Sequence, residues 1–129
     1  MKIQRAGPAE LSVVFNLLVE NGWGRRIMDL DRFGALVDAS TIADVAMIDG
    51  KVIGFVRAIT DGLSNGYLSM LVVASSHRGK GVGTALVKHA MGTDPRVTWM
   101  LRAGREGAEE FFSKLGFEVS TIAMERLRS

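Results

Sequence analysis

A run of apolar residues, YLSMLVV at 67–73, is followed by a segment with three glycines, HRGKGVG at 77–83, and then by a helix-forming run, TALVKHA at 84–90. This junction constrains the fold more than any other part of the sequence. A second β-type run, VTWML at 97–101, follows after Pro95 has ended the helix. Because a helical crossover returns the chain to the same end of a sheet, we predict that strands 67–73 and 97–101 lie parallel.

Periodicity predicts the other elements. Apolar residues recur at helical spacing after Pro8. Two β-type runs flank Asp49-Gly50, a dipeptide that is typical of two-residue hairpins. Gly116 is a suitable stop for the last helical pattern. We expect strands at 2–6, 41–48, 51–60, 67–73, 97–101 and 117–127, and helices at 8–20, 29–39, 82–90 and 107–116.

This order of elements predicts an α/β fold of the α+β type. We expect a mixed, mostly antiparallel central sheet of about six strands with helices on both faces and one parallel strand pair. A chain of 129 residues, 47% of them apolar, is long enough to bury a core. No linker or repeat divides it, so a single domain spanning 1–129 is expected.

Composition argues against several classes of function. A net charge of +2 is too small for a general nucleic-acid binder, although it is compatible with a small anionic ligand. Without cysteine, and with only His77 and His89 twelve positions apart, neither a thiolate nor a histidine-rich metal site is expected. The first residues form no apolar signal segment, and no apolar run reaches membrane-spanning length. We therefore expect a cytoplasmic protein with no nucleic-acid or membrane partner and no metal.

The glycine-rich junction has the features of an anion-binding site. The first backbone N–H groups of a helix have no partner within the helix, and the helix dipole adds positive potential there. Glycines let the main chain approach a phosphate closely. Arg78 and Lys80 add charge beside these N–H groups. The alternative is a tight turn with exposed basic residues, but three alternating glycines favour a phosphate cradle.

Three phosphate-binding patterns can be compared with this segment. The P-loop pattern fails on residue order, and the dinucleotide pattern fails because Thr84 stands where its third glycine belongs. The third pattern, R-x-x-G-x-G, matches at Arg78, Gly81 and Gly83. With the flanking strand and helix, this segment resembles the coenzyme A-binding motif of the GNAT acyltransferase superfamily. Downstream, AEEFFSKLGFE at 108–118 resembles that family's A-x-x-F-Y-E-K-L-G-F segment.

The resemblance implies an N-acetyltransferase that moves the acetyl group of acetyl-CoA to a primary amine of a small molecule or peptide. Direct attack is expected because the chain has no cysteine and no evident Ser-His-acid set. The family's parallel strand pair splays apart, and the pantetheine arm of acetyl-CoA pairs with the exposed main chain in the gap. Members of the family often form homodimers, and here the last strand could pair across subunits.

The resemblance also implies site residues. The backbone N–H near Leu71 would polarise the thioester carbonyl, and this is the one catalytic group that the resemblance indicates. Backbone N–H groups of the glycine turn would hold the pyrophosphate, with Arg78 and Lys80 adding charge. The implied coenzyme A-binding residues are Leu71, Val72, Val73, Arg78, Gly79, Lys80, Gly81, Val82, Gly83, Thr84, Arg105, Phe111 and Phe112.

The sequence departs from the family pattern at three points. Phe112 replaces the tyrosine that often protonates the leaving thiolate, although thiolate is a tolerable leaving group without help. Arg105 replaces a frequent asparagine and could face coenzyme phosphates, an acidic substrate or only solvent. The usual glutamate base is missing between Gly66 and Val73. Candidate bases by proximity in sequence are Ser69, Asp61 and His77, and the acceptor could lie against Trp23, Arg25 and Arg26.

Two other functions remain open at this stage. The missing tyrosine and glutamate would also fit a non-catalytic module that keeps coenzyme A as a sensor or structural ligand. The glycine turn alone would fit a domain that binds another nucleotide. The sequence identifies neither the acceptor nor the general acid and base.

Overall fold

A five-stranded mixed sheet organises the chain. The computed structural model describes all residues from 1 to 129. The strands are β1 (Lys2–Arg5), β2 (Ile42–Ile48), β3 (Lys51–Thr60), β4 (Asn65–Val73) and β5 (Thr98–Leu101). They lie in sequence order, and neighbours from β1 to β4 pair antiparallel, whereas β4 and β5 pair parallel. The predicted parallel pair is therefore confirmed.

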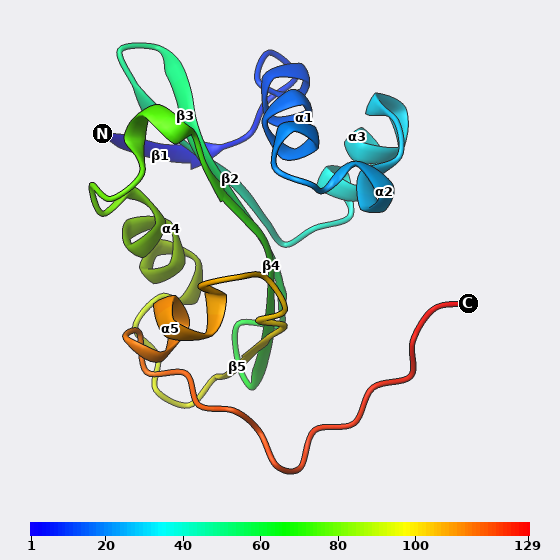
Figure 1. Ribbon diagram of the computed structural model, residues 1–129, viewed down its shortest axis with the longest axis vertical. Helices are drawn as coiled ribbons and strands as arrows, with labels where there is room; N and C mark the ends of the chain where they lie inside the picture. Colours follow the sequence, from blue (N-terminus) through cyan, green and yellow to red (C-terminus); the bar gives the residue numbers. More distant parts are fainter.

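Helices cover both faces of this sheet (Figure 1). They are α1 (Leu11–Glu20), α2 (Gly24–Ile27), α3 (Leu30–Asp38), α4 (Val82–Met91) and α5 (Ala108–Ser113), with a 3₁₀ turn, η1, at Ser75–His77. Helices α1 to α3 pack on one face, and α4 and α5 pack on the other. The four-residue helix α2 was not predicted, because one turn is too short for apolar periodicity to show. No helix in the chain has both the length and the apolar character needed to cross a bilayer.

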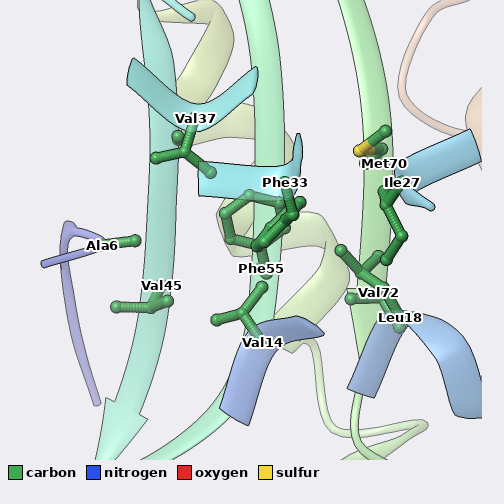
Figure 2. Close-up of a cluster of buried hydrophobic side chains, with 11 residues drawn as sticks. Ala6, Val14, Leu18, Ile27, Phe33, Val37, Val45, Phe55, Met70 and Val72 are labelled. Atoms are coloured by element: carbon green, nitrogen blue, oxygen red, sulfur yellow. The ribbon is translucent and has the colours of Figure 1, made fainter. Parts of the chain in front are cut away.

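The core beneath α1 to α3 is built around Phe33 and Phe55. Their rings meet edge to face, with centroids 5.9 Å apart. Figure 2 shows these rings between the sheet and the helices, with Leu18 and Ile27 beside Val72 of β4. Helix α3 begins where the side chain of Asp29 accepts a hydrogen bond from the N–H of Arg32, a standard N-terminal cap.

The second core lies between the other face of the sheet and helices α4 and α5. Leu86 and Val87 of α4 are fully buried against Val56 and Leu68 of the sheet. Phe112 anchors α5 to the same cluster and is 8% exposed. Burying one such side chain stabilises the fold by roughly 1.5–3 kcal/mol, so α4 and α5 are held by packing despite their modest lengths.

An irregularity in the middle of β4 changes which way its side chains point. Phe55 of β3 faces Val72, yet Arg57 faces Ser69, so β4 has one extra residue between these pairs. Met70 has φ of +54°, which is uncommon for a residue with a side chain. As a result, Leu68 faces α4 and α5, whereas Met70 and Val72 both belong to the core under α1 to α3. The sequence gives no sign of this bulge.

The prediction of about six strands is wrong in one place. Residues 117–127 were expected to form a final strand, but they form no regular element, and the sheet has five strands. Figure 1 shows this segment leaving α5 and running away from the body of the molecule. A strand exists only when a neighbour supplies backbone hydrogen bonds, and no backbone hydrogen bond joins residues 118–127 to another part of the chain.

Candidate functional site

A cleft opens where β4 and β5 stop pairing. The parallel ladder runs from Asn65 opposite Thr98 to Leu68 opposite Leu101 and ends there, whereas β4 continues to Val73. The cleft beyond this point has a volume of about 880 Å³, which is within the usual range for ligand sites. Its walls come from β4, the glycine turn, α4, the segment between β5 and α5, and α5 itself.

The edge of β4 forms the floor of this cleft. Leu71, Val72 and Val73 line it, and on their β5 side they have no partner strand. Their side chains are partly or fully buried in the two cores, as expected from a plain strand. The main chain is therefore what this edge presents to a ligand, and an unpaired strand edge readily accepts an extended group.

The glycine turn closes one end of the cleft and begins α4. Gly79 and Gly81 have φ of +74° and +83°, a region that glycine enters without strain. The first α-helical bond joins the N–H of Ala85 to the carbonyl of Gly81 at 3.0 Å. The N–H groups of Val82, Gly83 and Thr84 thus have no partner within the helix, and no acidic residue stands in its first turn. This end of α4 is well suited to an anion.

Gly83 has a different reason to be glycine. Its backbone is not in the positive-φ region, but a Cβ built there would lie 3.3 Å from Cζ of Phe111 and 3.6 Å from Cγ2 of Val73. All three residues line the cleft. The missing side chain therefore keeps the space between α4 and α5 open. Gly79 and Gly81 allow the positive-φ backbone of the turn, whereas Gly83 leaves room for a ligand in the cleft.

Arg78 links the glycine turn to the opposite wall. Its Nε donates to the carbonyl of Val73 at 3.1 Å, and its Nη2 donates to Oδ1 of Asn21, at the end of α1. No carboxylate lies within ion-pair distance of Arg78, because the ion pairs of the structure are His89–Asp44, Arg96–Asp94 and Arg102–Glu125. Its positive charge is therefore available to an anionic ligand at the mouth of the cleft.

Arg105 completes this wall from the segment between β5 and α5. Its guanidinium lies over the ring of Trp23, 4.2 Å from the centroid, and donates to the carbonyl of Asn21. Partial burial lowers the pKa of Arg105, but an arginine stays charged. Asn21, Trp23 and Arg105 thus form a bridge between the N-terminal helices and the α5 side of the cleft.

A smaller group of polar side chains lies further along β4, on the side of the N-terminal helices. Tyr67 and Ser69 line the cleft, and Ser69 stands opposite Arg57 in the sheet. Arg57 is only 9% exposed, and its Nε donates to Oγ of Ser40 at 2.7 Å. Burial lowers the pKa of Arg57, and its coulombic interaction with Tyr67 opposes that shift.

The structure brings most of the sequence-predicted residues together. Of the thirteen candidates for coenzyme A binding, twelve line the cleft, and Lys80 alone does not. Lys80 is exposed. Among the candidate bases, Ser69 and His77 line the cleft. Asp61 does not line it, because it is held in the β3–β4 turn by hydrogen bonds from Ser64, Leu63 and Asn65.

Only some of the residues predicted for the acceptor side line the cleft. Trp23 and Arg26 line the cleft, whereas Arg25 does not, and His89 pairs with Asp44 outside it. Tyr67 lines the cleft although it was not among the predicted site residues, and Asn21, also not predicted, contacts Arg78 and Arg105 of the cleft walls. The family motifs could not have indicated Asn21, because it acts through its contacts with Arg78 and Arg105, which lie 57 and 84 positions further along the chain. No group of three or more His, Cys, Asp or Glu side chains is placed to hold a metal ion.

The sequence similarity to known proteins extends beyond the two motifs. The sequence profile of a family described as "Acetyltransferase (GNAT) domain" matches residues 38–119. Peptidyl-lysine N-acetyltransferase YjaB from Escherichia coli (strain K12) is 36% identical over 58 residues. That match spans 45% of this chain and 40% of the E. coli protein, so it covers less than half of either.

Two solved structures share almost the whole fold at low sequence identity, and a third shares part of it. A protein from Xanthomonas campestris pv. campestris, described as an acetyltransferase of the GNAT family, has a TM-score of 0.82 at 21% identity, covering 98% of this chain and 92% of that one. A GNAT family acetyltransferase from Streptococcus pneumoniae TIGR4 has a TM-score of 0.78 at 23% identity, covering 98% and 96%. An aminoglycoside 6'-N-acetyltransferase complexed with coenzyme A has a TM-score of 0.60 at 27% identity, covering 70% and 53%.

Proposed function

Because the GNAT profile matches residues 38–119, more than half of the sequence, the chain belongs to the GNAT acetyltransferase family, and we propose that it transfers an acetyl group from acetyl-CoA to a primary amine of a small molecule or peptide. Membership makes the chain an acyltransferase. The acceptor and the course of the reaction are our proposal. Relatives named for peptidyl-lysine and for aminoglycosides support an amine acceptor.

The main support for this proposal is that three features lie together in one cleft, two of them suited to binding an anion and one suited to pairing with an extended group. The free N–H groups at the start of α4, the uncompensated charges of Arg78 and Arg105, and the open edge of β4 all line the same 880 Å³ space. A ligand with a phosphate-rich end and an amide-containing arm needs this combination. Acetyl-CoA is such a ligand, and the residues present fit it.

We assign the chemical roles as follows. The N–H groups of Val82, Gly83 and Thr84 would bind the pyrophosphate, and Arg78 would add charge beside them. The main chain of 71–73 would pair with the pantetheine arm. The N–H of Leu71 would donate to the thioester oxygen as negative charge develops there. Losing one such donor typically costs roughly 10²–10³ in rate. Acetyl-CoA supplies an acyl group already activated as a thioester.

The acceptor amine must be neutral when it attacks. Tyr67, Ser69 and His77 are the polar side chains of the cleft nearest in sequence to the floor strand. We propose that one of these side chains handles the proton that the amine loses as its nitrogen bonds to the carbonyl carbon, with His77 accepting it directly or with Tyr67 or Ser69 relaying it to water. The C–S bond then breaks, and the thiolate leaves without a hydroxyl from Phe112, which has none.

Calorimetric titration with acetyl-CoA tests the binding half of the proposal. We expect saturable one-site binding by the wild-type chain and strongly reduced binding by Gly81→Glu, which places negative charge in the cradle. Gly81→Ala is the matched control, because it carries the same positive-φ strain without the charge. If Gly81→Glu binds as well as Gly81→Ala, the phosphates do not lie at this turn.

An assay of acetyl transfer to a panel of amines tests the catalytic half of the proposal. Release of free thiol in the presence of an amine, with the acetyl group recovered on that amine, is the expected result. A folded chain that binds acetyl-CoA but transfers to no amine in the panel would instead be a coenzyme A-binding module. Comparison of Tyr67→Phe, Ser69→Ala and His77→Gln by pH profile then identifies the group, since loss of the proton acceptor removes a pKa from the profile, whereas loss of a relaying hydroxyl lowers the rate and leaves the profile's shape unchanged.

A further inference from the structure

Arg57, in the middle of β3, carries a buried positive charge that the proposed chemistry does not use. The residue is only 9% exposed. The ion pairs of the structure join other residues, so no carboxylate of the chain lies within ion-pair distance of this guanidinium. Arginine is almost never buried in a native protein unless its charge is paired. The chain therefore leaves room for a negative partner that it does not itself supply.

The end of α3 compensates this charge only in part. The Nε of Arg57 donates to Oγ of Ser40, just after the C-terminal end of α3, where the helix dipole contributes partial negative charge. Arg5 already donates to three carbonyls at that end. The two Nη groups of Arg57 make no hydrogen bond with the chain, and neither is enclosed, because the enclosed side-chain atoms without a partner are the indole nitrogens of Trp23 and Trp99. Both Nη groups are therefore open to an acceptor from outside the chain.

This guanidinium lies beside the cleft, on the side of the N-terminal helices. Arg57 and Ser69 are directly paired in the β3–β4 ladder, and such pairs project from the same face of a sheet. That face carries α1 to α3, because Phe55, two residues before Arg57, belongs to the core beneath them. Ser69 and Tyr67 line the cleft, whereas Arg57 does not. Arg57 thus lies directly behind the part of the wall that Ser69 and Tyr67 form.

The cleft itself is poor in negative charge. Glu106 is the one carboxylate that lines it, against four arginines at positions 26, 78, 102 and 105. Of these arginines only Arg102 has an ion-pair partner, Glu125. An acceptor with several positive charges would be repelled by such a lining, whereas an acceptor with a negative group would be attracted. The lining and the buried guanidinium behind it therefore favour the same kind of acceptor.

We propose that the acceptor is a small amine that also carries a carboxylate, and that Arg57 binds this carboxylate through its free Nη groups, between Ser69 and Tyr67. The inference rests on the proposed function, because it concerns the acceptor of the same transfer. Leu71, whose N–H would polarise the thioester, is two residues from Ser69, at most about 7 Å along the strand. An amine and a carboxylate a few bonds apart can thus occupy both places at once. The amine loses its proton and bonds to the acetyl carbon, the C–S bond of acetyl-CoA breaks, and the carboxylate only positions the molecule.

Matched pairs of acceptors test the inference on the wild-type chain. Each pair is an amino acid and its amide, taken from glycine, β-alanine and γ-aminobutyrate, so that the negative charge differs within a pair and the spacing differs between pairs. For at least one pair we expect kcat/KM to be roughly 10- to 100-fold higher for the acid, the usual size of a hydrogen bond to a charged group. The amide has the more readily deprotonated amine, so intrinsic reactivity opposes this preference. Transfer with no preference for the acid in any pair would overturn the inference and leave the proposed function standing.

Variants of Arg57 test which residue binds the carboxylate. Arg57→Met removes the charge and keeps much of the side chain's volume, and a chain relieved of an unpaired buried charge should still fold. We expect its preference for the acid to disappear, mainly through a higher KM for the acid, with the KM for acetyl-CoA unchanged. Arg57→Lys should keep part of the preference. Arg32→Gln removes an exposed charge of α3 outside the cleft and is the matched control. A folded Arg57→Met chain that keeps the full preference would contradict the assignment.

Calorimetry in the presence of coenzyme A separates this inference from the transfer itself. Coenzyme A has no acetyl group to give, so the wild-type chain saturated with it can be titrated with both members of each pair without turnover. We expect saturable binding of at least one acid and roughly 10- to 100-fold weaker binding of its amide. If this difference appears but no amine is acetylated, the proposed transfer fails and the carboxylate site stands. If acid and amide bind alike in every pair, or no acid binds, the carboxylate site is wrong.

Discussion

Replacing Gly83 with alanine should separate ligand binding from stability. The new methyl group would lie 3.3 Å from Cζ of Phe111, which is tight but can be relieved by a shift of a few tenths of an ångström. In compensation, alanine favours the first turn of α4 over glycine by up to about 1 kcal/mol. We therefore expect the free energy of unfolding to change by less than about 1 kcal/mol.

Binding should respond much more strongly. The methyl group enters the part of the cleft between α4 and α5, where Gly83, Val73 and Phe111 all face the space. Crowding of this kind costs about 1–3 kcal/mol. This corresponds to roughly 5- to 150-fold in the Kd for acetyl-CoA. Titration calorimetry measures the Kd, and thermal unfolding measures the stability of the same preparation.

Gly81→Ala is the contrasting variant. Nothing lies within 4 Å of the Cβ that it adds, but its φ of +83° is unfavourable for alanine by about 1–2 kcal/mol. We expect this variant to lose stability and to bind acetyl-CoA better than Gly83→Ala does. Unchanged affinity in a folded Gly83→Ala chain would refute the assignment of this space to the ligand.

Three further outcomes follow from the structure. Arg105→Ala should weaken acetyl-CoA binding and lower stability by about 0.5–1 kcal/mol, the usual size of an exposed cation–π contact, and Arg105→Lys should restore part of both in calorimetry and thermal unfolding. Gly66→Ala should lower the Tm by several degrees, because its Cβ would lie 2.4 Å from the ring of Trp99 and such overpacking costs about 1–3 kcal/mol. Hydrogen bonds, first from the side chain of Ser64, hold the pKa of Asp61 well below its ordinary value of 3.8. The carboxylate thus stabilises the fold above pH 3.8 and loses that effect as the pH falls towards its folded-state pKa, so Asp61→Asn should flatten the acid limb of a Tm-against-pH curve.

The sequence was sufficient for features that depend on short-range chemistry. Asp49-Gly50 predicted a hairpin, and both residues have positive φ between β2 and β3. The glycine turn predicted a helix start at the end of a strand, and α4 begins at Val82. In such places one or two residues determine the backbone, so the pattern carries most of the information.

Features that depend on contacts between residues far apart in the chain could not be predicted from the sequence. The bulge at Met70 places its side chain in the core under α1 to α3, and nothing in SML at 69–71 marks it. The segment 117–127 has a β-type composition, yet strand formation needs a neighbour that this single chain does not provide. Placing Tyr67 in the cleft required the end of the β4–β5 ladder at Leu68, which only the fold determines.

The open edge of β4 bears on how this protein can vary between species. If the main chain of 71–73 makes the contacts with acetyl-CoA, any apolar side chain that fits the two cores serves equally well at those positions. Selection at these positions would then act on backbone geometry and on fit to the two cores rather than on side-chain chemistry. A saturation library at Leu71 should accordingly tolerate valine, isoleucine and methionine and reject proline, which alone removes the N–H.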